Sequence, residues 1–217
     1  MKKQMDLKIK CCGLFREQDI LAANRLRPDY IGFVFFKKSP RAVTEEQAAK
    51  LKALLDPGIR AAGVFVDEDP EIIAGLLNRG IIDAAQLHGS ETEEDILALR
   101  KRTEKPVIKA FVVGTGQDLK AVEDSSADYV LIDSGRGSGK TLDRSLLEKL
   151  GNLKRPWFLA GGLNPQNIEE ALEIFRSGQA SDSFLYGVDV SSGIETDHLK
   201  DPAKMERFIK TVRRFRE

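Results

Sequence analysis

The chain has 217 residues, a length that suits one large domain or two small ones. Lysine plus arginine and aspartate plus glutamate both number 34, so the formal net charge is zero. This balance argues against a nucleic-acid groove and against a basic membrane surface. Apolar residues make up 41% of the chain, which is enough for a hydrophobic core and excludes a disordered composition.

The start of the chain and its cysteines favour a cytoplasmic protein. No long apolar stretch follows Met1–Asp6, so we expect no signal peptide, and no run reaches the roughly 18 apolar residues of a membrane span. The two cysteines, Cys11 and Cys12, are adjacent, and neighbouring residues rarely meet disulfide geometry. We therefore expect two free thiols, which fit a reducing compartment.

Short apolar runs rich in Val, Ile, Phe and Tyr alternate with segments of helical pattern. They predict eight strands: Lys8–Cys11, Tyr30–Val34, Ala61–Phe65, Ala84–Leu87, Val107–Phe111, Tyr129–Ile132, Trp157–Ala160 and Tyr186–Val190. Strand followed by helix, repeated in this way, predicts an α/β fold of the (β/α)₈ barrel type, with residues 1–217 as a single domain. The alternative is an open doubly wound sheet, but the turn at Cys12-Gly13-Leu14 is too poor in glycine for a dinucleotide fingerprint.

Capping residues mark the helix starts between these strands. Thr44 begins a capping box with Gln47, and Thr92 precedes three acidic residues that suit the positive end of a helix. At three further starts an Asp or Asn stands before a proline at the first helical position: Asp69, Asn164 and Asp201. The last segment, Lys204–Arg216, carries an apolar stripe at helical spacing: Met205, Phe208, Ile209, Val212 and Phe215.

The residues that follow each strand are the candidates for chemistry, because parallel barrels carry their active sites at the carboxyl ends of the strands. Cys12 follows the first expected strand and Asp133 follows the sixth. A thiol and a carboxyl at two strand ends could form an acid–base pair. The glycine spacing of the next segment, Gly135–Lys140, does not match a Walker loop, so we expect a mobile lid there.

Side-chain alternation separates the two cysteines. Lys10 and Cys12 project to one face of the first strand, whereas Ile9 and Cys11 project to the other. We assign the apolar set to the helix side, which makes Cys11 a small buried residue and Cys12 the reactive candidate. A nearby ammonium group such as that of Lys10 would increase the thiolate fraction of Cys12. Taken alone, a cysteine at a strand end such as Cys12 is more often structural, and an aspartate such as Asp133 more often caps a helix or turn.

Small residues follow the seventh and eighth expected strands, at Gly161-Gly162 and Ser192-Gly193. Barrels often bind phosphate with these two loops through backbone N–H groups, so a phosphate site is one interpretation and ordinary tight turns are the other.

Two single residues leave their role open on sequence grounds. Arg41 could hold a carboxylate with its planar guanidinium or could be a surface arginine. His88 could be a hydrogen-bonding group near the site or a plain strand-end histidine. His88 and His198 are far apart and no carboxylates cluster with them, so we expect no metal centre.

Taken together, these segments resemble the phosphoribosylanthranilate isomerases, cofactor-free barrel enzymes of tryptophan biosynthesis. The matching segments run in family order and cover essentially the whole chain: Lys10–Leu14, Gly32–Arg41, Gly63–Val66, Gln86–Gly89, Val107–Ala110, Asp133 with Gly137–Thr141, Leu159–Pro165 and Val188–Glu195. The resemblance implies an Amadori rearrangement of N-phosphoribosylanthranilate to carboxyphenylamino-deoxyribulose phosphate. It implies no cofactor and a small phosphorylated sugar–anthranilate substrate, and it leaves monomer and homodimer open.

The resemblance also implies roles for single residues. Cys12 matches the general base of the family and Asp133 matches its general acid. Arg41 matches an arginine expected to hold the anthranilate carboxylate, Asp189 matches an aspartate on the ribose side, and His88 lies in a matching segment as a substrate-binding residue. The small residues at the seventh and eighth strands match the phosphate-binding turns: Gly161, Gly162, Ser192 and Gly193.

Two other functions stay open at this point. Indole-glycerol-phosphate synthase is a related barrel enzyme with a similar substrate, but it needs a lysine acid at a strand end and usually a longer N-terminal extension. A non-catalytic barrel that only binds a phosphorylated ligand would keep the phosphate turns without needing Cys12 or Asp133. The presence of both a thiol and a carboxyl favours the isomerase.

Overall fold

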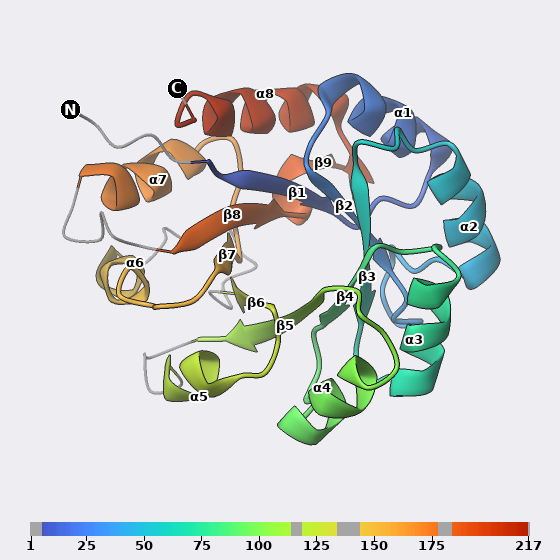
Figure 1. Cartoon of the computed structure of the whole chain (residues 1–217). Helices are drawn as coiled ribbons and strands as arrows, with labels where there is room; N and C mark the ends of the chain where they lie inside the picture. The colour runs from blue at the N-terminus through green and yellow to red at the C-terminus, as the bar shows by residue number, and fades with distance from the viewer. Residues whose placement is uncertain (1–5, 114–118, 134–143, 178–183, 217) are drawn as a thin grey trace. The chain divides into compact units, whose positions relative to one another are not determined.

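A computed structural model describes residues 6–113, 119–133, 144–177 and 184–216 (Figure 1). Eight parallel strands, β1 to β8, pair in chain order into a closed barrel, and an α-helix follows each of them along the chain. The expected (β/α)₈ fold class is therefore confirmed. The lid expected at Gly135–Lys140 lies outside the described residues.

The strands and helices have the following bounds. The barrel strands are β1 (Lys8–Cys12), β2 (Tyr30–Val34), β3 (Arg60–Phe65), β4 (Ala84–Leu87), β5 (Val107–Val112), β6 (Tyr129–Asp133), β7 (Trp157–Ala160) and β8 (Leu185–Val190). The helices are α1 (Glu17–Leu26), α2 (Glu45–Ala53), α3 (Pro70–Asn78), α4 (Glu93–Arg100), α5 (Leu119–Asp124), α6 (Arg144–Leu150), α7 (Ile168–Ser177) and α8 (Pro202–Arg213). A short 3₁₀ helix, η1 (Ser192–Ile194), and a two-stranded ribbon, β9 (Glu195–Thr196) with β10 (Leu199–Lys200), precede α8.

The expected strands are all present, and those that differ are one residue longer than expected. The extension places Cys12 and Asp133 at the last position of β1 and of β6, rather than directly after them. The strands extend this far because parallel pairing continues to their last residues: Cys12 pairs with Gly32, and Asp133 pairs with Ala160. Both functional candidates are thus held by strand hydrogen bonding, which restricts their backbone more than a loop would.

The described residues form two compact units, which we treat separately. The first unit comprises Lys10–Ala110 with Ser125–Tyr129. The second unit comprises Met1–Ile9, Phe111–Asp124 and Val130–Glu217.

In the first unit, helices α1 to α4 cover one face of β2, β3 and β4 (Figure 1). The side chains on that face are apolar and buried, with Ile31, Phe33 and Phe65 at 0–1% exposure. The capping box expected at Thr44 is present, and the helix expected after Thr92 begins there with a capping box of its own. Helix burial, and capping at α2 and α4, therefore follow the sequence pattern in this unit.

The sequence pattern did not predict how the N-terminus of helix α1 is capped. Its N-terminus is closed by the buried carboxylate of Asp19, which accepts the backbone N–H groups of Phe15 at 3.2 Å and Arg16 at 3.1 Å. The same carboxylate forms an ion pair with the Arg16 guanidinium at 2.6 Å. The capping group lies inside the first turn instead of before it, so a search for an Asp, Ser or Thr at the start of the helix misses it.

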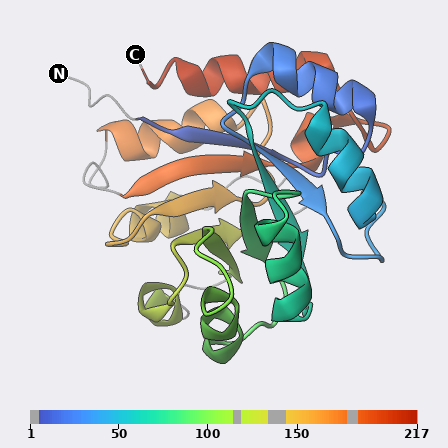
Figure 2. The same ribbon diagram turned by 45° about the vertical axis from the view of Figure 1, so that its right-hand side comes forward.

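In the second unit, α7 and α8 run beside each other (Figure 2). The apolar stripe expected on the last helix is confirmed, because Met205, Phe208, Ile209, Val212 and Phe215 are all buried. The helix start expected at Pro165 is wrong, since α7 begins at Ile168 and residues 165–167 form a turn. The Asn164 carboxamide accepts the N–H groups of Gln166 and Asn167, at 2.8 and 3.1 Å, and so stabilises that turn before the helix.

The described part of the chain contains no helix that is long and apolar enough to cross a membrane.

The N-terminus of α8 supplies a test of the capping argument. Asp201 accepts the N–H groups of Ala203 at 2.9 Å and Lys204 at 3.2 Å, and the Thr196 hydroxyl at 2.7 Å. The Thr196 hydrogen bond is the largest cause that lowers the pKa of Asp201 below its ordinary value of 3.8. A lowered pKa means that the charged carboxylate stabilises the fold above pH 3.8 and that this contribution is lost as the pH falls below it.

We predict that Asp201→Ala lowers the free energy of unfolding by about 1 kcal/mol at pH 7. The difference from the wild-type protein should shrink as the pH falls below the ordinary carboxyl pKa, as measured by urea denaturation at several pH values. Thr196→Val removes the hydroxyl donor and so brings the pKa of the Asp201 carboxyl closer to its ordinary value. The loss of stability on acidification should therefore begin at a higher pH in this variant. A loss that is equally large at all pH values would contradict the charged cap.

Candidate active site

In the first unit, the Cys12 thiol occupies space that Gly32 leaves open. The two residues are register partners in β1 and β2. A Cβ atom added at Gly32 would lie 2.6 Å from the Cys12 Sγ, which is closer than real side-chain contacts allow. Cys12 is 6% exposed and Cys11 is fully buried, so Cys11 is the small core residue expected from the alternation.

Strand register places Cys12 on the same face of the sheet as Gln86. Gly32 pairs with Cys12, and Val34, two residues further along β2, pairs with Val64. Val64 in turn pairs with Gln86 of β4. Because paired residues and residues two apart share a face, this face carries the thiol, a row of small and β-branched residues and the Gln86 amide.

His88 continues the same face at the end of β4. The Gln86 Nε2 lies 2.9 Å from the His88 Nδ1, which is the geometry of an amide N–H donating to the ring. A neutral ring that accepts at Nδ1 carries its proton on Nε2, so His88 can donate a hydrogen bond from that nitrogen. The Gln86 Oε1 is buried and has no hydrogen-bond partner among the residues that the structure describes.

A buried ion pair holds the turn that follows His88. The Lys109 ammonium donates to the Glu91 carboxylate and to the Gly89 carbonyl, both at 2.7 Å. Glu91 also accepts the N–H groups of Gly89 and Asp67, both at 2.9 Å. Sequence reasoning missed this pair, because a lysine and a glutamate 18 residues apart carry no local signal of a contact.

Arg41 lies in the loop after β2, which folds back onto the end of that strand. Ala42 forms a parallel bridge with Val34, and the Val43 N–H donates to the Val34 carbonyl at 2.9 Å. The Arg41 N–H donates to the Ser39 hydroxyl at 3.1 Å, which fixes the turn between them. Arg41 is therefore a half-buried residue near the carboxyl end of β2 and not a freely exposed one.

In the second unit, Asp133 and Asp189 lie on one face of the sheet. Asp133 pairs with Ala160, which lies two residues after Phe158 in β7. Phe158 pairs with Gly187, which lies two residues before Asp189 in β8. Asp133 is half-buried and Asp189 is 8% exposed, so both carboxyls are largely shielded from water.

The turns after β7 and β8 present unpaired backbone donors. Gly161 and Gly162 have φ values of 87° and 67°, which favour glycine. A Cβ atom at Gly193 would lie 1.9 Å from the Leu163 carbonyl oxygen, so the two turns touch and only glycine fits. Within the described residues, the N–H groups of Gly162, Ser192 and Gly193 have no hydrogen-bond partner. Closely spaced free N–H groups are a common way to bind a phosphate.

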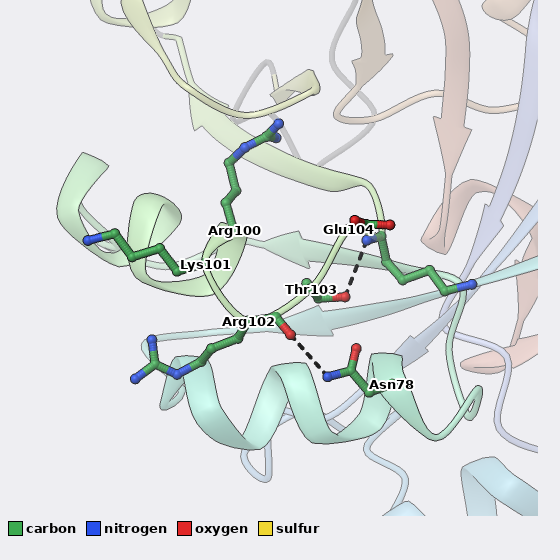
Figure 3. A pocket seen from close by; sticks show the side chains of 7 residues that line it. Asn78, Arg100, Lys101, Arg102, Thr103 and Glu104 are labelled. Carbon is green, nitrogen blue, oxygen red and sulfur yellow. Dashed lines mark hydrogen bonds between the residues drawn. The ribbon is translucent and has the colours of Figure 1, made fainter.

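A surface hollow of about 730 Å³ in the first unit lies elsewhere, between the end of α4 and the start of β5. Arg100, Lys101 and Arg102 line it, but their side chains point away from one another (Figure 3). Arg100 forms an ion pair with Asp128 at 2.7 Å. Because the basic groups do not converge and the strands begin here, this hollow is not the candidate active site.

Comparisons with known proteins show the family of the chain. A sequence model described as N-(5'phosphoribosyl)anthranilate (PRA) isomerase matches residues 9–211. An N-(5'-phosphoribosyl)anthranilate isomerase of Clostridium acetobutylicum is 39% identical, over 97% of this chain and 100% of its own length.

Two solved structures are also similar. One is a phosphoribosyl anthranilate isomerase in complex with reduced 1-(o-carboxyphenylamino)-1-deoxyribulose 5-phosphate, with a TM-score of 0.80 and 31% identity over 95% of this chain and 98% of the other. The second shows monomers of the dimeric phosphoribosylanthranilate isomerase from Thermotoga maritima, with a TM-score of 0.78 and 30% identity over 95% of this chain and 98% of the other.

Fold and similarity together define the class of protein as an isomerase enzyme built on a (β/α)₈ barrel. The chain belongs to the N-(5'-phosphoribosyl)anthranilate isomerase family of tryptophan biosynthesis.

One methyl group added at Gly32 tests whether the position of the Cys12 thiol depends on the space that the glycine leaves. We predict that Gly32→Ala displaces the thiol and lowers kcat by about 10²-fold, the scale expected for a misplacement of roughly 1 Å. The rate of Cys12 alkylation by iodoacetamide should change in parallel. The measurements are steady-state kinetics and mass spectrometry of the labelled protein.

Gly75→Ala is the matched control, because a Cβ atom there meets no heavy atom closer than 3.7 Å. It should leave kcat unchanged and stabilise α3 slightly. Equal activity of the two variants would show that Gly32 does not set the thiol position.

Proposed function

We propose that the chain catalyses the Amadori rearrangement of N-(5'-phosphoribosyl)anthranilate to the carboxyphenylamino-deoxyribulose phosphate, with Cys12 as general base and Asp133 as general acid. The observation that carries the proposal is that these two residues end strands β1 and β6 of a chain that belongs to the isomerase family. Asp133 shares its sheet face with Asp189, and Cys12 shares its face with His88. Each proposed proton-transfer group thus has a proposed substrate-binding group on its own face.

The reaction needs two proton transfers of opposite direction. Asp133 in its protonated form gives its proton to the furanose ring oxygen, and the bond between that oxygen and C1 breaks as the anthranilate nitrogen forms an iminium bond to C1. Cys12 as thiolate removes the proton from C2, which yields the enolamine. Tautomerisation of the enolamine to the ketone moves a proton from the C2 hydroxyl to C1, so the overall change is an isomerisation. The steps consume no redox equivalent and call for no cofactor.

The remaining sites would bind the two anionic ends of the substrate. We assign the phosphate to the turns at Gly161-Gly162 and Ser192-Gly193, because the N–H groups of Gly162, Ser192 and Gly193 have no hydrogen-bond partner among the described residues and can donate to an anion. Arg41 would hold the anthranilate carboxylate through its planar fork. His88 would donate from Nε2, and Asp189 would accept from the ribose hydroxyls.

We further propose that residues 1–217 act as a single cytoplasmic domain whose partner is the small phosphorylated substrate, with no nucleic acid bound. For assembly we propose a monomer or a homodimer, and the dimeric Thermotoga maritima relative supports the second.

We predict that Cys12→Ser and Asp133→Asn each lower kcat by about 10²–10⁴-fold, because each removes one proton-transfer group. Affinity for a reduced product analogue should change much less, since neither group is assigned to binding. The loss of phosphoribosylanthranilate fluorescence measures turnover, and calorimetric titration measures affinity.

Cys11→Ala is the control for the first substitution, since it removes the neighbouring thiol, which is fully buried. It should keep near-normal kcat. Normal turnover of Cys12→Ser would refute the assignment of the base, and a wild-type protein that binds the analogue without turnover would favour a non-catalytic barrel.

Arg41→Ala should raise the KM about tenfold or more and change kcat less, because it removes a charge-assisted hydrogen bond to the substrate carboxylate. Arg79→Ala is the control, since Arg79 forms a surface ion pair with Glu45 at 2.5 Å at the far end of α3. An unchanged KM in Arg41→Ala would remove this residue from the anthranilate site.

A further inference from the structure

Lys200 and Glu195 form a buried ion pair to which the proposed reaction gives no role. Their side chains are 1% and 5% exposed, and the Nζ and Oε1 atoms are 2.5 Å apart. The two residues are register partners in the short ribbon of β9 and β10. Taking two charges out of water costs free energy that their mutual attraction only partly returns, so such a pair is weak as a source of stability alone.

The same ammonium group reaches the turn that follows β8. Lys200 Nζ donates to the Ser191 carbonyl oxygen at 3.0 Å and lies 3.5 Å from the Ser191 hydroxyl. The Ser191 carbonyl and the Ser192 N–H belong to one peptide unit, and in a trans peptide the two bonds point in opposite directions. The Ile194 N–H donates to the same carbonyl at 3.3 Å. The ammonium group adds a second, shorter and charged donor, so it helps to fix the carbonyl direction and with it the direction of the Ser192 N–H.

The ammonium group acts on the strength of that donor as well as on its direction. A cation bound to a peptide carbonyl polarises the peptide unit and makes its N–H a stronger donor. The Ser192 and Gly193 N–H groups have no partner among the described residues, so both are available to a ligand. On the other side of the turn, Gly193 packs against the Leu163 carbonyl, which leaves the turn little freedom to move.

We propose that Lys200, held by Glu195, is a positioning residue for phosphate binding: it fixes and polarises the Ser191–Ser192 peptide so that the turn presents its N–H groups to the phosphate. This inference rests on the proposed function, which assigns the phosphate to this turn. Lys200 itself does not touch the substrate in this account, and Glu195 acts through Lys200.

The test removes both charges together, because a single substitution would leave one buried charge unpaired. In Lys200→Met/Glu195→Gln, the KM for phosphoribosylanthranilate should rise about tenfold or more while kcat stays within about twofold. Inorganic phosphate, used as a competitive inhibitor, should lose affinity by a similar factor. A purely structural role would lower the amount of folded enzyme without this selective change in KM and phosphate affinity.

Lys204→Met is the matched control. Lys204 Nζ donates to the Glu195 carbonyl at 2.6 Å, so it is a lysine of the same neighbourhood that binds the ribbon and not the Ser191 carbonyl. Its KM and its inhibition by phosphate should equal those of the wild-type protein. An equal rise in KM in Lys204→Met would show that general loosening of the ribbon, and not the Ser191 contact, causes the effect.

The outcomes separate this inference from the proposed function. If phosphate does not inhibit the wild-type enzyme, the assignment of the turn to phosphate fails, and the proposed substrate site fails with it. If phosphate inhibits the wild-type enzyme and the double variant equally, the turn binds phosphate and the role of Lys200 is refuted. Should that variant not fold, Lys200→Gln/Glu195→Gln replaces it, because two amides can hydrogen-bond to each other without a buried charge: a raised KM at unchanged kcat supports the proposal, and an unchanged KM overturns it.

Discussion

The parallel register of the strands is the constraint on which the candidate site depends. A parallel ladder sends alternate side chains to opposite faces, so one pairing decides which groups can meet a ligand. The register places Gly32 beside Cys12 and Ala160 beside Asp133. In both cases the register partner of the proposed catalytic residue is small, which leaves space at the strand end. A slip of one residue would turn the thiol to the apolar face and put Cys11 in its place.

The strands and most helix starts could be predicted because their causes are local. A short apolar run bounded by turn residues indicates a buried strand, and Thr44 meets its capping partner Gln47 only three residues away. The start of α7 was misplaced because Asn164 has the right chemistry for a helix cap but stabilises a preceding turn. The choice between turn and helix depends on how the chain leaves β7, which the local pattern does not contain.

The two buried ion pairs could not be predicted, and they have a common arrangement. Lys109 donates to the Gly89 carbonyl and Lys200 donates to the Ser191 carbonyl, and each lysine is neutralised by a glutamate near the same turn. In the sequence these residues are indistinguishable from the many charged residues of a solvated surface. Their effect is to replace a flexible loop by a turn with a fixed peptide direction, which is what a binding group needs to keep its geometry.

In the proposed site, phosphate binding and proton transfer are assigned to different kinds of groups: backbone N–H groups of the turns bind, and side chains on the strands transfer protons. Backbone N–H groups have no accessible titration, so the turns present the same donors to a phosphate at any pH at which the protein is folded. In the proposed reaction the thiol of Cys12 and the carboxyl of Asp133 instead change protonation during each turnover, and both residues lie on strands, where the ladder restricts their backbones. In this proposal a chain with zero formal net charge holds the phosphate of its substrate with directed peptide N–H groups, and the only cation assigned to direct contact with the substrate is Arg41 at its carboxylate end.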